Sequence, residues 1–140
     1  LLQNAQTSAE HGSIAEAWAK IKEAQTLNPD LTVPPENWIS LCWCGAAWNQ
    51  PQLVFGACDR AVELDRYEFR SRRNRGIVRA LTGDIAGAIL DFEYVVQFWT
   101  VEGRSMSPVW TADPEAWIAA LKADNDPHEV FTAATLERLR

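Results

Sequence analysis

The chain has little of several features on which enzymes and membrane proteins depend. Among its 140 residues only His11 and His128 are histidines, and neither lies in a Cys/His or Ser/His/Asp pattern. Its seven glycines form no phosphate-binding loop. No stretch approaches the roughly 20 apolar residues that a membrane-spanning helix needs. We therefore expect no enzyme activity, no cofactor and no contact with a membrane.

Cysteine is also scarce, with three residues. An odd number argues against a secreted scaffold stapled by disulfides, so a reducing cytoplasm is the expected location. Cys42 and Cys44 are two positions apart and would point about 200° apart on a helix, too far to share one metal ion. Cys42 and Cys58 are expected to be buried core thiols. The sequence thus predicts no metal site.

The charge and the composition further narrow the class of protein to which the chain can belong. The net charge of −6 and the pI of about 4.9 disfavour nucleic acid as the partner. A hydrophobic fraction of 47% gives one domain a continuous core, and no long stretch alternates with the period of a strand. These observations predict an all-α domain. The first residue is Leu rather than Met, so we expect either a trimmed chain or a piece of a larger protein.

The stretch from residue 74 to residue 92 has the pattern of two short helices folded on each other. The first ends at Leu81, where Gly83 suits a left-handed helix end and Asp84 suits the N-cap of the next helix. The second helix has apolar residues at helical spacing, and small residues allow the two backbones to approach closely. The apolar residues are Ile85, Ala88, Ile89 and Phe92, and the small ones Gly76, Ala80 and Ala88.

The same pattern recurs twice. A step back of about 34 residues takes small and apolar positions of this pair onto similar residues. Gly76, Ala88, Phe92 and Val95 fall on Cys42, Val54, Cys58 and Ala61, behind an opening Trp38-x2-Leu41. A further step, three residues longer, reaches Gly12, Ala17, Ile21, Ala24 and Pro29.

These motifs resemble the tetratricopeptide repeat (TPR), a helix-turn-helix unit of about 34 residues. With the closing motifs WIAALKADNDP and TLERLR, the chain is similar to a TPR module near the C-termini of large bacterial, often cyanobacterial, signalling proteins. The resemblance implies a right-handed α-solenoid of three units, at about 1–31, 35–68 and 69–101, and a helical cap at 102–140. It implies a protein-interaction role, with a concave groove lined by the first helix of each pair.

The expected helices follow from start and stop signals. They cover about 2–11, 14–27, 35–48, 51–65, 68–81 and 84–99, with Ser13 as one N-cap. In the tail, Ser107-Pro108 and Asp113-Pro114 are helix-start signals, and Asp113 is expected to cap a helix that ends at Lys122. Thr132 is expected to cap a last helix up to Leu139. This tail is the candidate end cap of the repeat.

The groove residues follow from the repeat register and the family geometry. The stripe Trp38, Leu41, Cys42 and Gly45 is expected in the core, so the neighbouring stripe should face the groove. We predict an apolar floor and a basic rim that bind a protein or peptide carrying a carboxylate and an apolar anchor. The predicted contact residues are Ile39, Trp43, Ala46, Arg70, Arg73, Asn74 and Ile77.

Each feature has a second interpretation. The arginines at 66, 70, 72, 73, 75 and 79 could form a solvated, salt-bridged face, and Arg75 is expected to be structural. Trp43 could be covered by the tail through Trp110 or Trp117. The chain would then be a structural spacer or oligomerisation element whose groove holds its own tail. The sequence fixes neither the partner nor the oligomeric state.

Overall fold

The computed structural model is all-helical over the residues that it describes, which are 1–65, 69–100 and 108–139, with only the backbone described for 108–111. The helices are α1 (Leu2–Glu10), α2 (Ile14–Leu27), α3 (Pro35–Ala47), α4 (Phe55–Leu64), α5 (Phe69–Leu81), α6 (Ile85–Thr100), α7 (Pro108–Lys122), α8 (Pro127–Val130) and α9 (Ala133–Arg138). A short 3-10 turn, Pro51–Leu53, precedes α4. The prediction of an all-α fold is confirmed.

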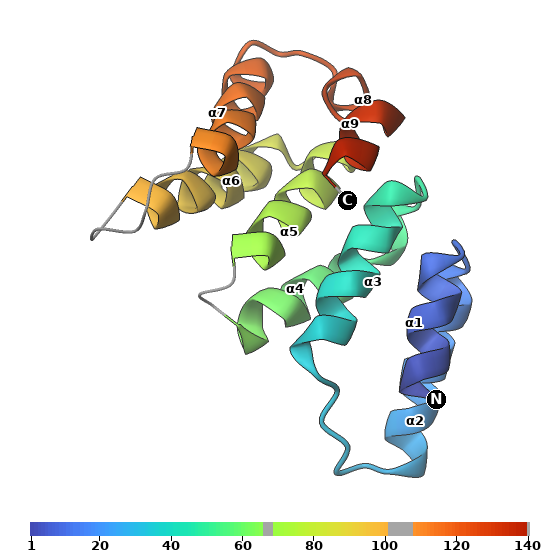
Figure 1. Cartoon of the computed structure of the whole chain (residues 1–140). Coiled ribbons are helices and arrows are strands. Elements are labelled where there is room, and N and C mark those ends of the chain that lie inside the picture. The colour runs from blue at the N-terminus through green and yellow to red at the C-terminus, as the bar shows by residue number, and fades with distance from the viewer. Residues whose placement is uncertain (66–68, 101–107, 140) are drawn as a thin grey trace.

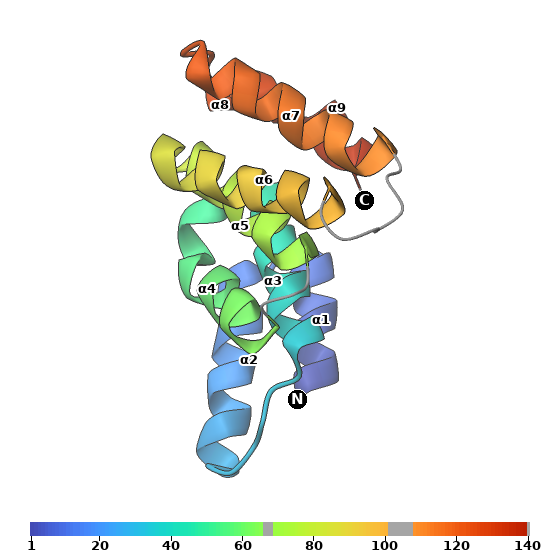
Figure 2. The same ribbon diagram turned by 90° about the vertical axis from the view of Figure 1, so that its left-hand side faces the viewer.

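The helices are arranged in consecutive pairs. Figures 1 and 2 show α1 with α2, α3 with α4 and α5 with α6 following one another, and α7 packed on α6 beyond them. The first helices of the pairs lie side by side, because α3 contacts both α1 and α5. The tail helices α8 and α9 then return toward α5 and α3 (Figure 1). This return places the end of the chain beside helices from the first half.

The three helix pairs turn in the same way. The residues at the turns, Gly12, Asn49 and Gly83, have positive φ angles of 84°, 56° and 95°. The residue after each donates its N–H to a carbonyl five positions back, and these bonds are 2.7–2.8 Å long. Glycine and asparagine adopt this left-handed conformation at helix ends most readily. The aligned residues of the sequence pattern therefore occupy equivalent turns.

The core is built from the aligned apolar positions. The small and apolar residues of the three second helices that the sequence pattern superimposed are all buried. They are Ala17, Ile21 and Ala24 in α2, Val54, Cys58 and Ala61 at α4, and Ala88, Phe92 and Val95 in α6. The core continues into the tail through Trp117, Leu121, Phe131 and Leu136.

Close approach within the third pair depends on Gly76. A Cβ added to Gly76 would lie 2.6 Å from the ring of Phe92, and that ring is fully buried against Trp117 and Phe131. We expect Gly76→Ala to lower the free energy of unfolding by about 1–2 kcal/mol, because overpacking outweighs the gain in helix propensity. Urea denaturation would measure the change.

Gly56→Ala is the matched control. Its Cβ would meet Trp18 at 3.5 Å, an ordinary contact. There the higher helix propensity of alanine should stabilise the chain, by up to about 1 kcal/mol. Equal effects of the two substitutions would show that the contact between Gly76 and Phe92 does not limit the packing.

Two expectations for local structure were wrong. Asp113 does not begin a helix, because α7 starts at Pro108, the other start signal, and runs through the buried Pro114. Packing of α7 against α6 stabilises a helix that Pro114 alone would interrupt. Ser13 stands at the N-cap of α2 but makes no capping side-chain hydrogen bond. Caps at Asp84 and Thr132 form as predicted, with bonds of 3.0 and 3.2 Å to Gly87 N and Thr135 N.

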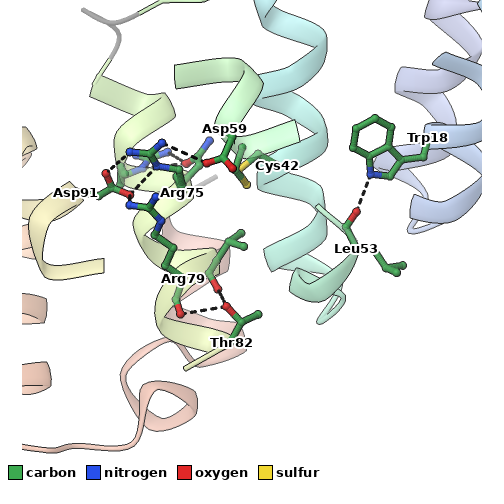
Figure 3. Close-up of a disulfide and its surroundings, with 12 residues drawn as sticks. Trp18, Cys42, Leu53, Asp59, Arg75, Arg79, Thr82 and Asp91 are labelled. Atoms are coloured by element: carbon green, nitrogen blue, oxygen red, sulfur yellow. Dashed lines mark hydrogen bonds and ion pairs between the residues drawn. A yellow bond between two sulfur atoms is a disulfide. The ribbon is translucent and has the colours of Figure 1, made fainter. Parts of the chain in front are cut away.

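The cysteine prediction also needs correction. Cys42 and Cys58 are buried as expected, but they form a disulfide between α3 and α4, with Cα atoms 4.9 Å apart (Figure 3). Cys44 is the remaining, buried cysteine. An odd number of cysteines therefore does not exclude a disulfide, because two of the three can pair and leave Cys44 outside the bond. This removes the argument by which the sequence indicated a reducing cytoplasm, and the location stays a prediction.

Candidate functional site

A hollow of about 400 Å³ lies where α1, α3 and α5 meet the end of α9. We call it the α3–α5 hollow. Its lining combines an apolar wall from α3, two arginines from α5 and amide side chains. The lining residues are Gln6, Glu36, Ile39, Ser40, Trp43, Arg70, Arg73, Asn74 and Leu139.

Five of the seven predicted contact residues line this hollow. They are Ile39, Trp43, Arg70, Arg73 and Asn74. Ala46 and Ile77 do not line it, and their exposures are 2% and 0%. Because α3 packs side by side with α5, residues on the facing stripes are buried between the helices. The predicted apolar floor is therefore mostly closed, and the half-buried Trp43 supplies its accessible part.

Trp43 and Arg73 form the centre of the hollow. The Arg73 guanidinium carbon lies 5.7 Å from the centroid of the Trp43 ring, a cation–π distance. Nε and one terminal nitrogen of Arg73 also donate to Asn74 Oδ1, both at 3.3 Å. Asn74 is 2% exposed, so packing holds its side chain in place as the hydrogen-bond acceptor of Arg73. These contacts orient a cation beside an aromatic face.

Arg70 stands at the rim. It donates to Glu36 Oε1 of α3 across the hollow at 3.2 Å. Both side chains are largely exposed, at 43% and 72%. Exposed pairs of this kind contribute roughly 0–1 kcal/mol to stability. A carboxylate entering the hollow could therefore replace Glu36 at little cost.

Trp43 also lines a second hollow. This α1–α3 hollow has a volume of about 350 Å³ and is lined by Glu10, Trp43, Ala47, Trp48, Ala133, Leu136 and Glu137. α9 packs against α3, and residues of the tail line both hollows. The tail thus does reach the surroundings of Trp43, but through Leu136 of α9 and Leu139, the residue that follows α9.

Trp117, one of the two tryptophans expected to cover Trp43, lies elsewhere. Trp117 is buried in the aromatic cluster with Phe92 and Phe131, each ring centroid 5.2 Å away. It therefore closes the end of the core next to α6. The side chain of Trp110 lies outside the described residues.

The remaining arginines of α5 serve the fold. Arg75 binds Asp91 of α6 in bidentate fashion at 2.8 and 2.9 Å, and Arg79 reaches the same carboxylate at 3.1 Å (Figure 3). Arg72 lies 3.7 Å from it and stacks on Tyr94 at 4.3 Å. Burial opposes the charge of Arg75, but its bonds with Asp91 prevail and raise its pKa. The predicted structural role of Arg75 is confirmed, whereas Arg66 lies outside the described residues.

Four lining residues, Gln6, Glu36, Ser40 and Leu139, are not among the predicted contact residues. The repeat register contained the signal for Gln6, because Gln6, Trp43 and Ile77 stand at the same position relative to the turns at Gly12, Asn49 and Gly83. No sequence signal points to Leu139, which depends on how the tail folds back. The described part of the chain contains no cluster of potential metal ligands and no helix suited by length and apolarity to cross a membrane.

Comparisons with known proteins are sparse. No protein-family model matches the chain, and no solved structure matches it. A mouse protein described as "FK506-binding protein-like" is 32% identical over 73 residues, which cover 47% of this chain and 21% of that protein. The chain therefore spans about a fifth of the length of the relative that it matches.

Proposed function

We propose that the chain is a right-handed α-solenoid of TPR units that binds a partner protein or peptide in the α3–α5 hollow. Three helix pairs with the same left-handed turn and the same buried positions support the repeat. Each first helix lies beside the next, from α1 to α3 to α5. Such stacking is how repeat proteins build extended binding surfaces.

The observation that carries the binding proposal is the Trp43–Arg73 pair. Trp and Arg are the residues most enriched among those that dominate interface energies. Here they share one hollow of about 400 Å³ with Arg70 and the fixed Asn74. In a chain of net charge −6, this basic rim selects a ligand that presents a carboxylate next to an apolar side chain.

A second candidate function is a structural spacer or oligomerisation element of a larger bacterial protein. It is favoured by one observation, the packing of α9 against α3 with tail residues lining both hollows. In this case the tail is the permanent occupant of the groove. The two functions differ in whether an external ligand competes with α9.

Selection from a displayed peptide library would test binding at the hollow. We expect peptides enriched on the wild-type chain to lose at least tenfold in affinity with Trp43→Ala and with Arg73→Glu, measured by fluorescence anisotropy. The reason is the loss of aromatic contact area or of the cation that faces the carboxylate. Circular dichroism would check that each variant keeps its helices.

Arg60→Glu is the matched charge control. Arg60 is exposed on α4, pairs with Glu63 of the same helix and does not line the hollow. It makes the same change in net charge as Arg73→Glu. Equal weakening by the two variants would point to general electrostatics, and failure to enrich any Trp43-dependent peptide would favour the spacer.

A further inference from the structure

We propose that the ligand of the α3–α5 hollow is a short amphipathic helix with leucines at positions i and i+3 and a flanking acidic residue, which binds by displacing α9. This inference rests on the proposed binding function and specifies its ligand. The argument comes from the segment of the chain that already lies at the site.

α9 and its C-cap residue present two leucines to the region around Trp43. Leu136 and Leu139 are three positions apart, so they share one side of the helix. Leu136 is 7% exposed and lines the α1–α3 hollow, and Leu139 lines the α3–α5 hollow. Both hollows include Trp43. The surface around Trp43 is therefore shaped to receive a helix with this spacing.

α9 is attached by few elements. It has six residues, far fewer than an isolated helix needs in water. A cap at Thr132 and a bidentate ion pair of Arg138 with Asp113, at 2.7 and 3.1 Å, hold it in place. The hydrogen bond with Asp113 raises the pKa of Arg138, yet both partners reach solvent. Leu136 is thus its main buried anchor.

The open space beside α9 indicates what a better occupant would add. The α3–α5 hollow has arginines on the wall opposite Trp43, and α9 contributes only Leu139 to its lining. An acidic side chain next to the second leucine would reach Arg70 or Arg73. An external helix with that residue can therefore outcompete α9, even though α9 has the advantage of being tethered.

The chain's own tail supplies the probe. A fluorescent peptide of residues 126–140, DPHEVFTAATLERLR, with Arg140→Glu to supply the acidic residue beside the second leucine, would be titrated into the full-length wild type and into Leu136→Ala, which weakens the internal anchor. We expect the peptide to bind Leu136→Ala at least tenfold more tightly than wild type. Adding Trp43→Ala should abolish this gain. Val130 of the full-length protein is left unchanged, because it packs against the core.

Leu90→Ala is the control, since Leu90 is 65% exposed on α6. It should leave peptide binding at the wild-type level. Arg138→Glu, which opposes Asp113, is a second way to release α9 if Leu136→Ala unfolds the chain. Amide exchange of residues 133–139 should be faster in both releasing variants than in wild type.

Slow exchange of residues 133–139 in both variants would overturn the inference, because α9 would then be a fixed part of the core. Peptide binding that ignores Trp43 would overturn it as well. Either result could occur while the library still yields peptides that depend on Trp43 but lack the leucine pair. In that case the binding function would stand, and only the proposal of a helical ligand would be wrong. An empty library would count against the binding function itself.

Discussion

Asp91→Ala should lower the free energy of unfolding by about 3–5 kcal/mol, the cost of removing one partner from a buried ion pair. Asp91 is 1% exposed on α6 and accepts two hydrogen bonds from Arg75 and one from Arg79. Without it, the guanidinium of Arg75, 14% exposed, keeps Asp59 at 3.3 Å as its one carboxylate partner among the described residues. A domain of this size is typically stable by about 5–15 kcal/mol, so urea denaturation should show a large loss.

The exposed partner of the same arginine is the control for this prediction. Asp59 is 55% exposed, and Asp59→Ala removes a carboxylate at 3.3 Å from Arg75 without leaving a buried charge uncompensated. We expect that change to cost less than about 1 kcal/mol. Similar losses for the two variants would show that burial of Asp91 adds nothing to its pairing.

The helix pairs were predictable because their signals are local. A left-handed residue at each turn and apolar residues at helical spacing depend only on neighbouring positions, and those pairs formed within a few residues of the expected bounds. The start of α7 and the existence of α8 were harder to predict. Asp113 has the form of an N-cap, but in the structure its carboxylate binds Arg138, 25 positions away. Tertiary packing, absent from a local pattern, accounts for the position of Asp113 inside α7, whereas α8 begins at a local signal, Asp126 before Pro127, with the Asp126 side chain accepting from His128 N.

The candidate site also has residues that the sequence predicted and residues that it did not. The repeat register placed Trp43, Arg70 and Arg73 on a common hollow, because equivalent positions of stacked pairs face the same side. It did not predict how closely α3 and α5 pack, which buries Ile77 completely. Nor could it place Leu139, since the path of the tail depends on long-range contacts of α8 and α9.

The disulfide had a signal in the register that the count of cysteines obscured. Cys42 and Cys58 stand where the third pair has Gly76 and Phe92, and those two residues are in direct contact. Equivalent positions in stacked repeats hold equivalent geometry, so two cysteines there must be adjacent. The number of cysteines alone does not show which two of them the fold brings together.

Loss of this bond should be measurable as a drop in stability. We expect Cys42→Ala/Cys58→Ala to lower the free energy of unfolding by about 3 kcal/mol, because the bond closes a loop between residues 16 positions apart. For a chain of this length that corresponds to a fall in Tm of about 10 °C. Thermal unfolding with and without dithiothreitol would show it. Reductant should lower the Tm of wild type and leave that of the double variant unchanged.

Cys44→Ala is the control, because Cys44 takes no part in the bond. It should keep the response to reductant that wild type shows. Alkylation after unfolding without reductant should modify one cysteine in wild type and all three after reduction. Three modified cysteines without reduction would establish that Cys42 and Cys58 are free core thiols, and the original argument for a reducing cytoplasm would hold again. One modified cysteine would confirm that the disulfide ties α3, the helix that carries Trp43, covalently to α4.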